Sequence, residues 1–118
     1  MNYIDGFVTP VRIINKDSYL QHAAMTADVF KEYGALRVVE SWGDDVPEGK
    51  LTSFTMAIQR ADDEAVVQTL VEWPSKAVRD SAWKKIMADP RMDPANAAQP
   101  PFDGKRMIYG GFQMILEK

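Results

Sequence analysis

The alternation of apolar and polar positions divides the chain into four strands and two helices. Runs rich in β-branched and aromatic residues indicate strands at 2–14, 35–42, 65–73 and 106–116. Apolar residues three or four positions apart indicate helices at 17–33 and 75–89. The order strand, helix, two strands, helix, strand is the split βαβ arrangement. We therefore expect an α+β, ferredoxin-like fold, a βαββαβ antiparallel sheet with two helices on one face.

The element boundaries carry local signals of their own. We expect Ser75 to cap the second helix and Gly34 to end the first, because glycine adopts a left-handed conformation without a Cβ penalty. Pro10 cannot donate to a ladder, which indicates an edge or a bulge at that end of the first strand. The buried helix faces should comprise Leu20, Ala23, Ala27, Phe30 and Gly34 on the first helix, and Val78, Ala82, Trp83, Ile86 and Met87 on the second.

Two connections have less regular patterns. Residues 51–59 fit a helical turn as well as strand alternation, and a short helix or an irregular segment is the preferred interpretation. Residues 90–104 hold four of the seven prolines and no period, which is typical of a long surface loop.

Both faces of the predicted sheet are apolar. In the last strand, Ile108 and Phe112 lie on one face, and Met107 and Tyr109 lie on the other. An antiparallel sheet with one solvated face normally alternates between apolar and polar residues, and two helices can cover only one face. The simplest cover for the other is the same face of a second copy, so we expect a homodimer through the open sheet face.

Composition narrows the class of protein. A chain of 118 residues is expected to form one domain, 1–118, and 46% hydrophobic with 26% charged residues is a globular composition. The absence of cysteine excludes disulfides and thiolate metal sites. There is no signal-peptide pattern and no membrane-length apolar run, so we expect a soluble, cytoplasmic protein without a membrane partner. A net charge of −3 makes nucleic acid an improbable partner.

Segments from one end of the chain to the other carry a family resemblance. They read YIDGFV, GALRVVESWGDDVPEGK, WPSKAVRD, MADPRM and PFDGKRMIYGGF. With these the chain resembles the YbaA-like bacterial proteins, a family of unknown function. The resemblance implies a dimeric α/β barrel, in which two ferredoxin-like domains pack sheet to sheet, and no established activity. Some members carry a name that links them to signal-recognition-particle RNA. The loop DPANAAQPP before PFDG departs from the family pattern, which affects the loop and not the fold.

Three acidic residues fall within predicted strands: Asp5, Glu40 and Glu72. An ionised acid is costly there unless it is paired or faces a wet cavity. If the three shared a face, they could form an acid/base pair or an oxygen-ligand metal site. The preferred interpretation is structural ion pairs, with Arg37, Arg79 or Arg106 as partners.

Aromatic side chains of the strands could line a ligand pocket between sheet and helices, although core packing is the preferred role for most of them. Arg79, one turn into a helix that begins Trp73-Pro74-Ser75, could help to hold an anion, and a plain N-cap explains that sequence equally well. The candidate pocket residues are Asp5, Phe7, Glu40, Trp42, Trp73, Arg79 and Tyr109. No catalytic residue, metal site or cofactor is assigned.

Three further features have a structural explanation that the sequence favours over a functional site. His22, the only histidine, fits a surface or boundary position better than a general base. Gly110-Gly111 lies inside a strand, where we expect a bulge or a close backbone approach, with room for a ligand over the sheet as the alternative. Gly104-Lys105-Arg106 lacks the spacing of a phosphate-binding loop.

Three functions remain open at this point. The first is a small-molecule site between sheet and helices, for example that of a cofactor-free oxidoreductase or isomerase, although fold alone does not fix function. The second is a non-catalytic homodimeric interaction or regulatory module. The third, least favoured, is RNA binding through a cluster of Lys84, Lys85, Arg91, Lys105 and Arg106.

Overall fold

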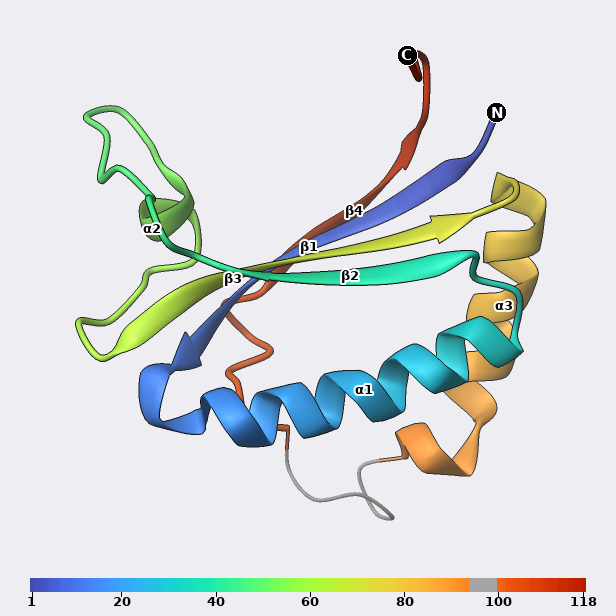
Figure 1. Ribbon diagram of the computed structural model, residues 1–118, viewed down its shortest axis with the longest axis horizontal. Helices are drawn as coiled ribbons and strands as arrows, with labels where there is room; N and C mark the ends of the chain where they lie inside the picture. The colour runs from blue at the N-terminus through green and yellow to red at the C-terminus, as the bar shows by residue number, and fades with distance from the viewer. Residues whose placement is uncertain (94–99) are drawn as a thin grey trace.

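The computed structural model describes residues 1–93 and 100–118. Its four antiparallel strands lie in the order β2-β3-β1-β4. They are β1 (Tyr3–Arg12), β2 (Arg37–Trp42), β3 (Glu64–Trp73) and β4 (Ile108–Gln113). The two long helices, α1 (Lys16–Glu32) and α3 (Lys76–Ala88), lie on one side of the sheet (Figure 1). The predicted ferredoxin-like α+β fold is confirmed.

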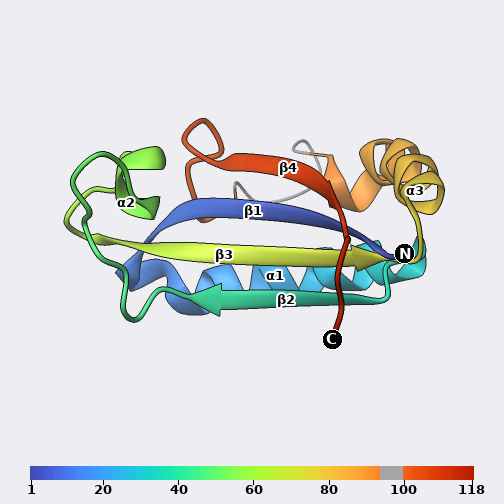
Figure 2. The same cartoon turned by 90° about the horizontal axis from the view of Figure 1, so that it is seen from above.

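Strand register decides which residues face the helices. β1 pairs with β3 from Tyr3↔Trp73 to Arg12↔Glu64, so the odd-numbered residues of both strands share the helix-facing side. The other side, here called the open face, is turned towards the reader in Figure 2. β4 pairs with β1 only as far as Val8, so Pro10 lies beyond the end of that ladder. The predicted edge at Pro10 is therefore confirmed on the β4 side.

The helix ends follow the sequence signals. The Ser75 hydroxyl accepts a hydrogen bond from the Val78 amide at 3.2 Å, and Gly34 follows α1 with a φ of 115°. The long connection between β2 and β3 contains a short helix, α2 (Phe54–Ala57), on the side of the sheet opposite α1 (Figure 1). The short 3₁₀ turns η1 (Ile13–Asn15) and η2 (Pro90–Met92) complete the elements. The remainder of the predicted 90–104 loop lies partly outside the described residues.

The buried face of α1 is rotated from the predicted one. Tyr19 is buried where Leu20 was expected, and Leu20 is 49% exposed. The hydroxyl of Tyr19 reaches a polar partner on the sheet, which a leucine at that position would leave unsatisfied. The residues that α1 buries are Tyr19, Ala23, Thr26, Val29 and Phe30.

The prediction for α3 was correct at Ala82 and Ile86, which are buried, and wrong at Met87, which is 78% exposed, and at Val78, which is also exposed. α3 lies at a corner of the sheet, near the end of β4 (Figure 2), so only part of its apolar stripe reaches the core. No helix within residues 1–93 and 100–118 has the length and apolar character needed to cross a membrane.

The last strand is shorter than predicted and contains no bulge. Its register with β1 runs without interruption through Gly110 and Gly111, so the expected bulge there was wrong. After Gln113 the chain leaves the ladder with one more bond, from the Met114 amide to the Asn2 carbonyl at 3.1 Å. The tail then crosses the strand ends on the open face (Figure 2).

Candidate functional site

Asp5 lies on the helix-facing side of β1 and is only 3% exposed. Its Oδ2 accepts hydrogen bonds from two indole N–H groups, of Trp73 at 2.9 Å and of Trp83 at 2.8 Å. Its Oδ1 accepts from Arg79 Nη2 at 2.7 Å, and Arg79 Nε lies 3.1 Å from both oxygens. A buried carboxylate is tolerated when a cation and further donors satisfy it, and both conditions are met here.

Arg79 is held from several directions. Besides Asp5, it donates from Nη1 to Asp80 at 2.9 Å, and its guanidinium lies 5.3 Å from the centre of the Tyr3 ring. The hydrogen bond to Asp5 raises the pKa of Arg79 further above its ordinary value, so the cation is permanent. A Cβ on Gly111 would collide with the Tyr3 hydroxyl and would lie 2.9 Å from Arg79 Nη2. Gly111 therefore provides the close approach that the arginine and tyrosine need.

The ion pair of Asp5 and Arg79 forms one end of an open hollow of about 630 Å³ beneath β1 and β4. Aromatic rings and thioethers make up most of its wall, with the Phe7 ring 6.2 Å from Tyr109 and 6.4 Å from Trp83. The hollow is lined by Asp5, Phe7, Arg79, Asp80, Trp83, Met87, Gly104, Met107 and Tyr109. We refer to it as the α3 hollow; its apolar wall and charged end resemble a small-molecule binding site.

Four of the seven predicted pocket residues lie in the α3 hollow: Asp5, Phe7, Arg79 and Tyr109. Trp73 is fully buried behind it and touches Asp5. Glu40 and Trp42 lie elsewhere. The Trp42 ring packs near the Val11 and Tyr19 cluster, under the ammonium of Lys16 at 5.1 Å. The prediction thus named one coherent group and two residues that do not join it.

Glu40 on β2 is a partly buried acid with hydroxyl partners. Its Oε2 accepts from the hydroxyls of Tyr19 and Thr69, each at 2.7 Å. Burial raises the pKa of Glu40, and the two hydroxyl donors oppose that shift only in part. Burial also raises the pKa of Tyr19, which remains a neutral donor.

Glu72, the third predicted acid, is on the open face. It accepts from Arg37 Nε at 3.0 Å and from Asn2 Nδ2 at 2.7 Å, and these bonds lower its pKa. Asp5 and Glu40 share the other face but have separate partners. The three acids therefore form no common acid/base pair or metal site, and within residues 1–93 and 100–118 no cluster of metal-ligating groups is found. The predicted ion pairs hold for Asp5 with Arg79 and for Glu72 with Arg37, while Glu40 has hydroxyls in place of an arginine.

Trp83, Met87, Asp80 and Met107 were missed as pocket residues. The signal was present on α3, because Arg79, Trp83 and Met87 are spaced four apart and lie on one side of the helix. The sequence pattern assigned Trp83 and Met87 to the core, because it could not show that α3 lies at the corner of the sheet.

His22 is half-buried, as expected of a boundary position. Its ring lies 5.7 Å from that of Phe102, and burial lowers its pKa. The contacts of His22 are thus separate from the α3 hollow.

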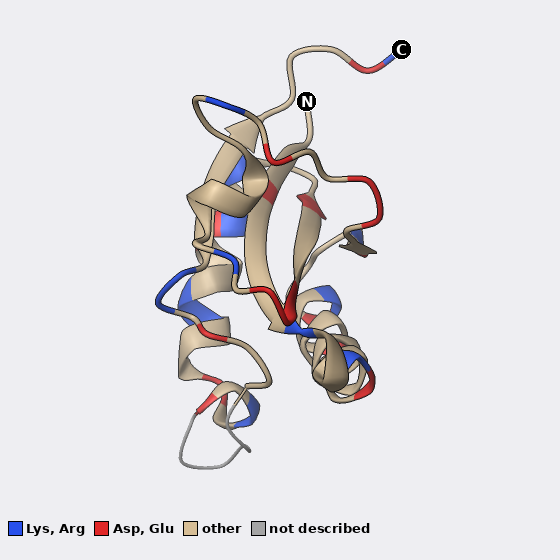
Figure 3. Cartoon of the chain, turned by 90° about the vertical axis from the view of Figure 1, so that its left-hand side faces the viewer, with Lys and Arg blue, Asp and Glu red and all other residues tan. Residues whose placement is uncertain are grey.

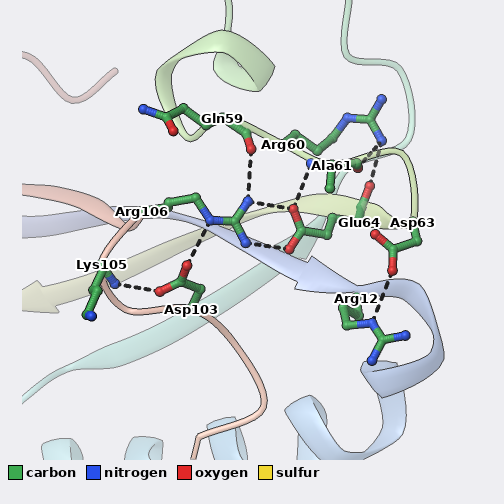
Figure 4. Close-up of polar contacts among 9 residues, drawn as sticks. All are labelled: Arg12, Gln59, Arg60, Ala61, Asp63, Glu64, Asp103, Lys105 and Arg106. Carbon is green, nitrogen blue, oxygen red and sulfur yellow. Dashed lines mark hydrogen bonds and ion pairs between the residues drawn. The ribbon is translucent and has the colours of Figure 1, made fainter.

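Arg106 joins its own loop to residues 59–64, a stretch that is distant in sequence (Figure 4). It forms a paired contact with Glu64, 2.7 Å at each nitrogen, and further bonds to Asp103 and to the Gln59 carbonyl. Arg91 is similarly paired, with Glu32 and Asp89. Acidic and basic segments are interspersed over the loops and helices (Figure 3). Two of the five residues suggested for RNA binding are thus already neutralised, which weakens that hypothesis.

Comparison with solved structures supports the class of protein that this fold defines. A dimeric ferredoxin-like protein from an uncultured marine organism superposes with a TM-score of 0.62 at 12% identity, covering all of both chains. A protein from Bacillus cereus named "putative antibiotic biosynthesis monooxygenase" superposes with a TM-score of 0.55 at 10% identity, covering 99% of this chain and 96% of that one. At such low identity these similarities establish a ferredoxin-like fold and nothing further.

Sequence comparison identifies the family. Residues 2–104 match the family described as "Protein of unknown function (DUF1428)". The chain is 52% identical over 118 residues to "Uncharacterized protein YbaA" of Escherichia coli (strain K12) and of Shigella flexneri, covering all of each chain. The chain therefore belongs to the DUF1428 family, which confirms the YbaA-like resemblance.

Proposed function

We propose that the protein binds a small, planar, largely apolar molecule in the α3 hollow. The observation that carries the proposal is a hollow of about 630 Å³ whose wall includes two exposed apolar side chains, Tyr109 at 73% and Met87 at 78%. Exposed aromatic and thioether groups around a concave surface favour an apolar ligand. The rings of Phe7 and Trp83 form the deeper part of the wall.

The charged end of the hollow supports binding rather than acid/base chemistry. Asp5 accepts from Arg79 and both indoles, and Asp80 accepts from Arg79 and from Lys76 at 2.9 Å. A general base needs a free lone pair directed at the proton that it removes. The donors to Asp5 take up both of its oxygens, and Asp80 is ion-paired with Lys76 and Arg79, so we assign the two acids to shaping and orienting the site.

We propose further that the protein is a homodimer through the open face, as a dimeric α/β barrel. Two apolar side chains of β4 are exposed on that face, Ile108 and Phe112. The solved structure of the ferredoxin-like protein from a marine organism is of a dimer, which supports the same assembly here. The α3 hollow is on the other side of the sheet, so a dimer of this kind leaves it accessible.

The binding proposal can be tested with 8-anilinonaphthalene sulfonate, an anionic dye whose aromatic rings bind to apolar surfaces. We expect the double variant Met87→Ser/Tyr109→Ser to bind the dye about tenfold more weakly than wild type, because two apolar walls are lost. Leu51→Ser is the matched control, since Leu51 is 98% exposed and does not line the α3 hollow, and the dye affinity of this variant should not change. Native mass spectrometry of gently purified protein provides a second readout, through a co-purifying small molecule. Unchanged dye binding in the double variant would refute the proposal.

A further inference from the structure

The open face has a glycine pair that the single chain does not require. Gly6 and Gly110 are direct cross-strand partners on β1 and β4. Neither has a positive φ, unlike Gly34 and Gly49. A Cβ built on Gly6 would lie 3.6 Å from the Phe112 ring, and one on Gly110 would lie 3.5 Å from it, which are ordinary contacts. Neither backbone strain nor crowding within the chain therefore explains these two glycines.

The two glycines lie under a shallow apolar hollow. It has a volume of about 290 Å³ and is bordered by Val8, Leu70, Ile108 and Phe112. The Phe112 ring leans towards the bare backbone and is 62% exposed. Glycine within a strand commonly marks a place where another group approaches the backbone closely.

Charge on the open face favours a second copy over a charged partner. The cross-strand pair Arg12↔Glu64 lies at one end and Arg37↔Glu72 at the other. Between these pairs, every strand residue that points to this face is uncharged. A two-fold axis brings identical surfaces together, and an uncharged centre allows this without like-charge repulsion.

We infer that the hollow over Gly6 and Gly110 receives an apolar side chain from a second copy of this chain. This inference rests on the proposed dimer and makes the glycine pair its point of closest contact. The absence of two Cβ atoms lets the partner's side chain reach the sheet backbone, and Phe112 packs beside it. Small central pockets filled by an apolar anchor carry much of the binding energy of such interfaces.

The test is to fill the hollow with larger side chains at Gly6 and Gly110. We expect Gly6→Val and Gly110→Val to raise the dimer dissociation constant by about tenfold to a hundredfold, as for overpacking of a fitted contact. Gly104→Val is the matched control, because a Cβ there meets nothing within 4 Å and Gly104 is not on the open face. Sedimentation velocity over a concentration series measures the constants, and circular dichroism with thermal melting confirms that each variant is folded.

The outcomes separate the inference from the dimer on which it rests. A wild-type dimer with folded, weakened glycine variants supports both. A wild-type dimer whose folded glycine variants associate as tightly as the Gly104→Val control would overturn the inference and leave the dimer standing. A wild-type monomer at tens of micromolar would overturn both. If the valines prevent folding, Phe112→Ser decides: its side chain is exposed in the single chain, and unchanged association would reject the role of the hollow.

Discussion

Two acidic side chains point from the sheet towards the helices, and the protein satisfies them in opposite ways. Asp5 is paired with the guanidinium of Arg79 and accepts from two indoles. Glu40 accepts from two hydroxyls, and within the described chain no lysine or arginine forms an ion pair with it. Both acids have similar places in the strand pattern. The difference shows that the partners brought in by the helices decide the electrostatic state of each acid.

The contrast extends to what each region can do. The ion pair of Asp5 with Arg79 places fixed charges beside the α3 hollow, and Trp83, one of the two tryptophans that donate to Asp5, also lines that hollow. The pairing at Glu40 lies under α1 and joins helix to sheet through Tyr19. We therefore expect substitutions around Asp5 to lower the free energy of unfolding strongly. Substitutions around Glu40 should lower it less, by an amount that depends on pH.

The largest expected effect comes from Asp5→Asn. The variant keeps the shape of the side chain but removes the buried carboxylate charge and leaves Asp80 as the carboxylate partner of Arg79, so it should lower the free energy of unfolding by about 3–5 kcal/mol. Urea denaturation measures this. The control is Glu72→Gln, whose partner Arg37 has a side chain 67% exposed, and it should cost less than about 1 kcal/mol. Equal losses of unfolding free energy in the two variants would show that the buried Asp5–Arg79 pair stabilises the fold no more than the exposed Glu72–Arg37 pair does.

The second effect concerns the close packing of Tyr3 and Arg79 against Gly111. Gly111→Ala places a Cβ against Tyr3 and Arg79, so we expect a loss of about 1–3 kcal/mol. Gly104→Ala adds the same methyl group in open space and should change stability by no more than about 0.5 kcal/mol. Thermal melts of both variants measure the difference. A Gly111→Ala protein as stable as wild type would mean that Arg79 does not need its present position.

Most of the fold was predictable because strands and caps depend on local signals. The β-branched run at 65–73 and the Ser75 cap are each decided by a few neighbouring residues, and each was found where expected. The helix faces were predicted less well. An apolar stripe says that a face is buried but not how far the helix lies from the centre of the sheet, so Met87 was assigned to the core.

The sequence predicted several residues of the candidate site but not how their side chains are arranged in space. Arg79 was among the three arginines expected to pair with the strand acids, and it pairs with Asp5, since a buried acid needs a cation. The two indole donors were not foreseen, because Trp73 and Trp83 meet at Asp5 only once β3 and α3 are packed together. Strand parity alone could not show that Glu72 would lie on the open face, since that depends on the register with β1.

A third, smaller effect concerns the hydroxyls around Glu40. Tyr19→Phe removes one of two donors to a partly buried carboxylate and should cost about 1 kcal/mol. The control is Tyr109→Phe, whose hydroxyl is at an exposed position and should contribute little. Chemical denaturation at pH 7 measures both. If Tyr19→Phe were neutral, the bond to Glu40 would contribute no net stability over solvation by water.

The smallest effect is a pH dependence that separates Glu40 from the cation-paired acids. Because the pKa of Glu40 is raised by burial, the folded protein holds this proton more tightly than the unfolded chain. Its contribution is fully present below the ordinary glutamate pKa and is lost as pH rises through the raised value. Glu40→Gln should therefore gain stability relative to wild type as pH rises through this window. We expect on the order of 0.5 kcal/mol, because water still reaches the group.

Glu64→Gln is the matched comparison for that titration, and its slope should be opposite. Arg106 lowers the pKa of Glu64, so the stability that this acid supplies is present above the ordinary glutamate pKa and lost as pH falls through the lowered value. Relative to wild type, Glu64→Gln should therefore be at its least stable near neutral pH and should approach wild type in acid. Urea titrations from pH 3 to 8 measure both difference curves, in which the acids common to variant and wild type cancel. Parallel slopes would contradict the view that Glu40 is stabilised by holding its proton and Glu64 by losing it.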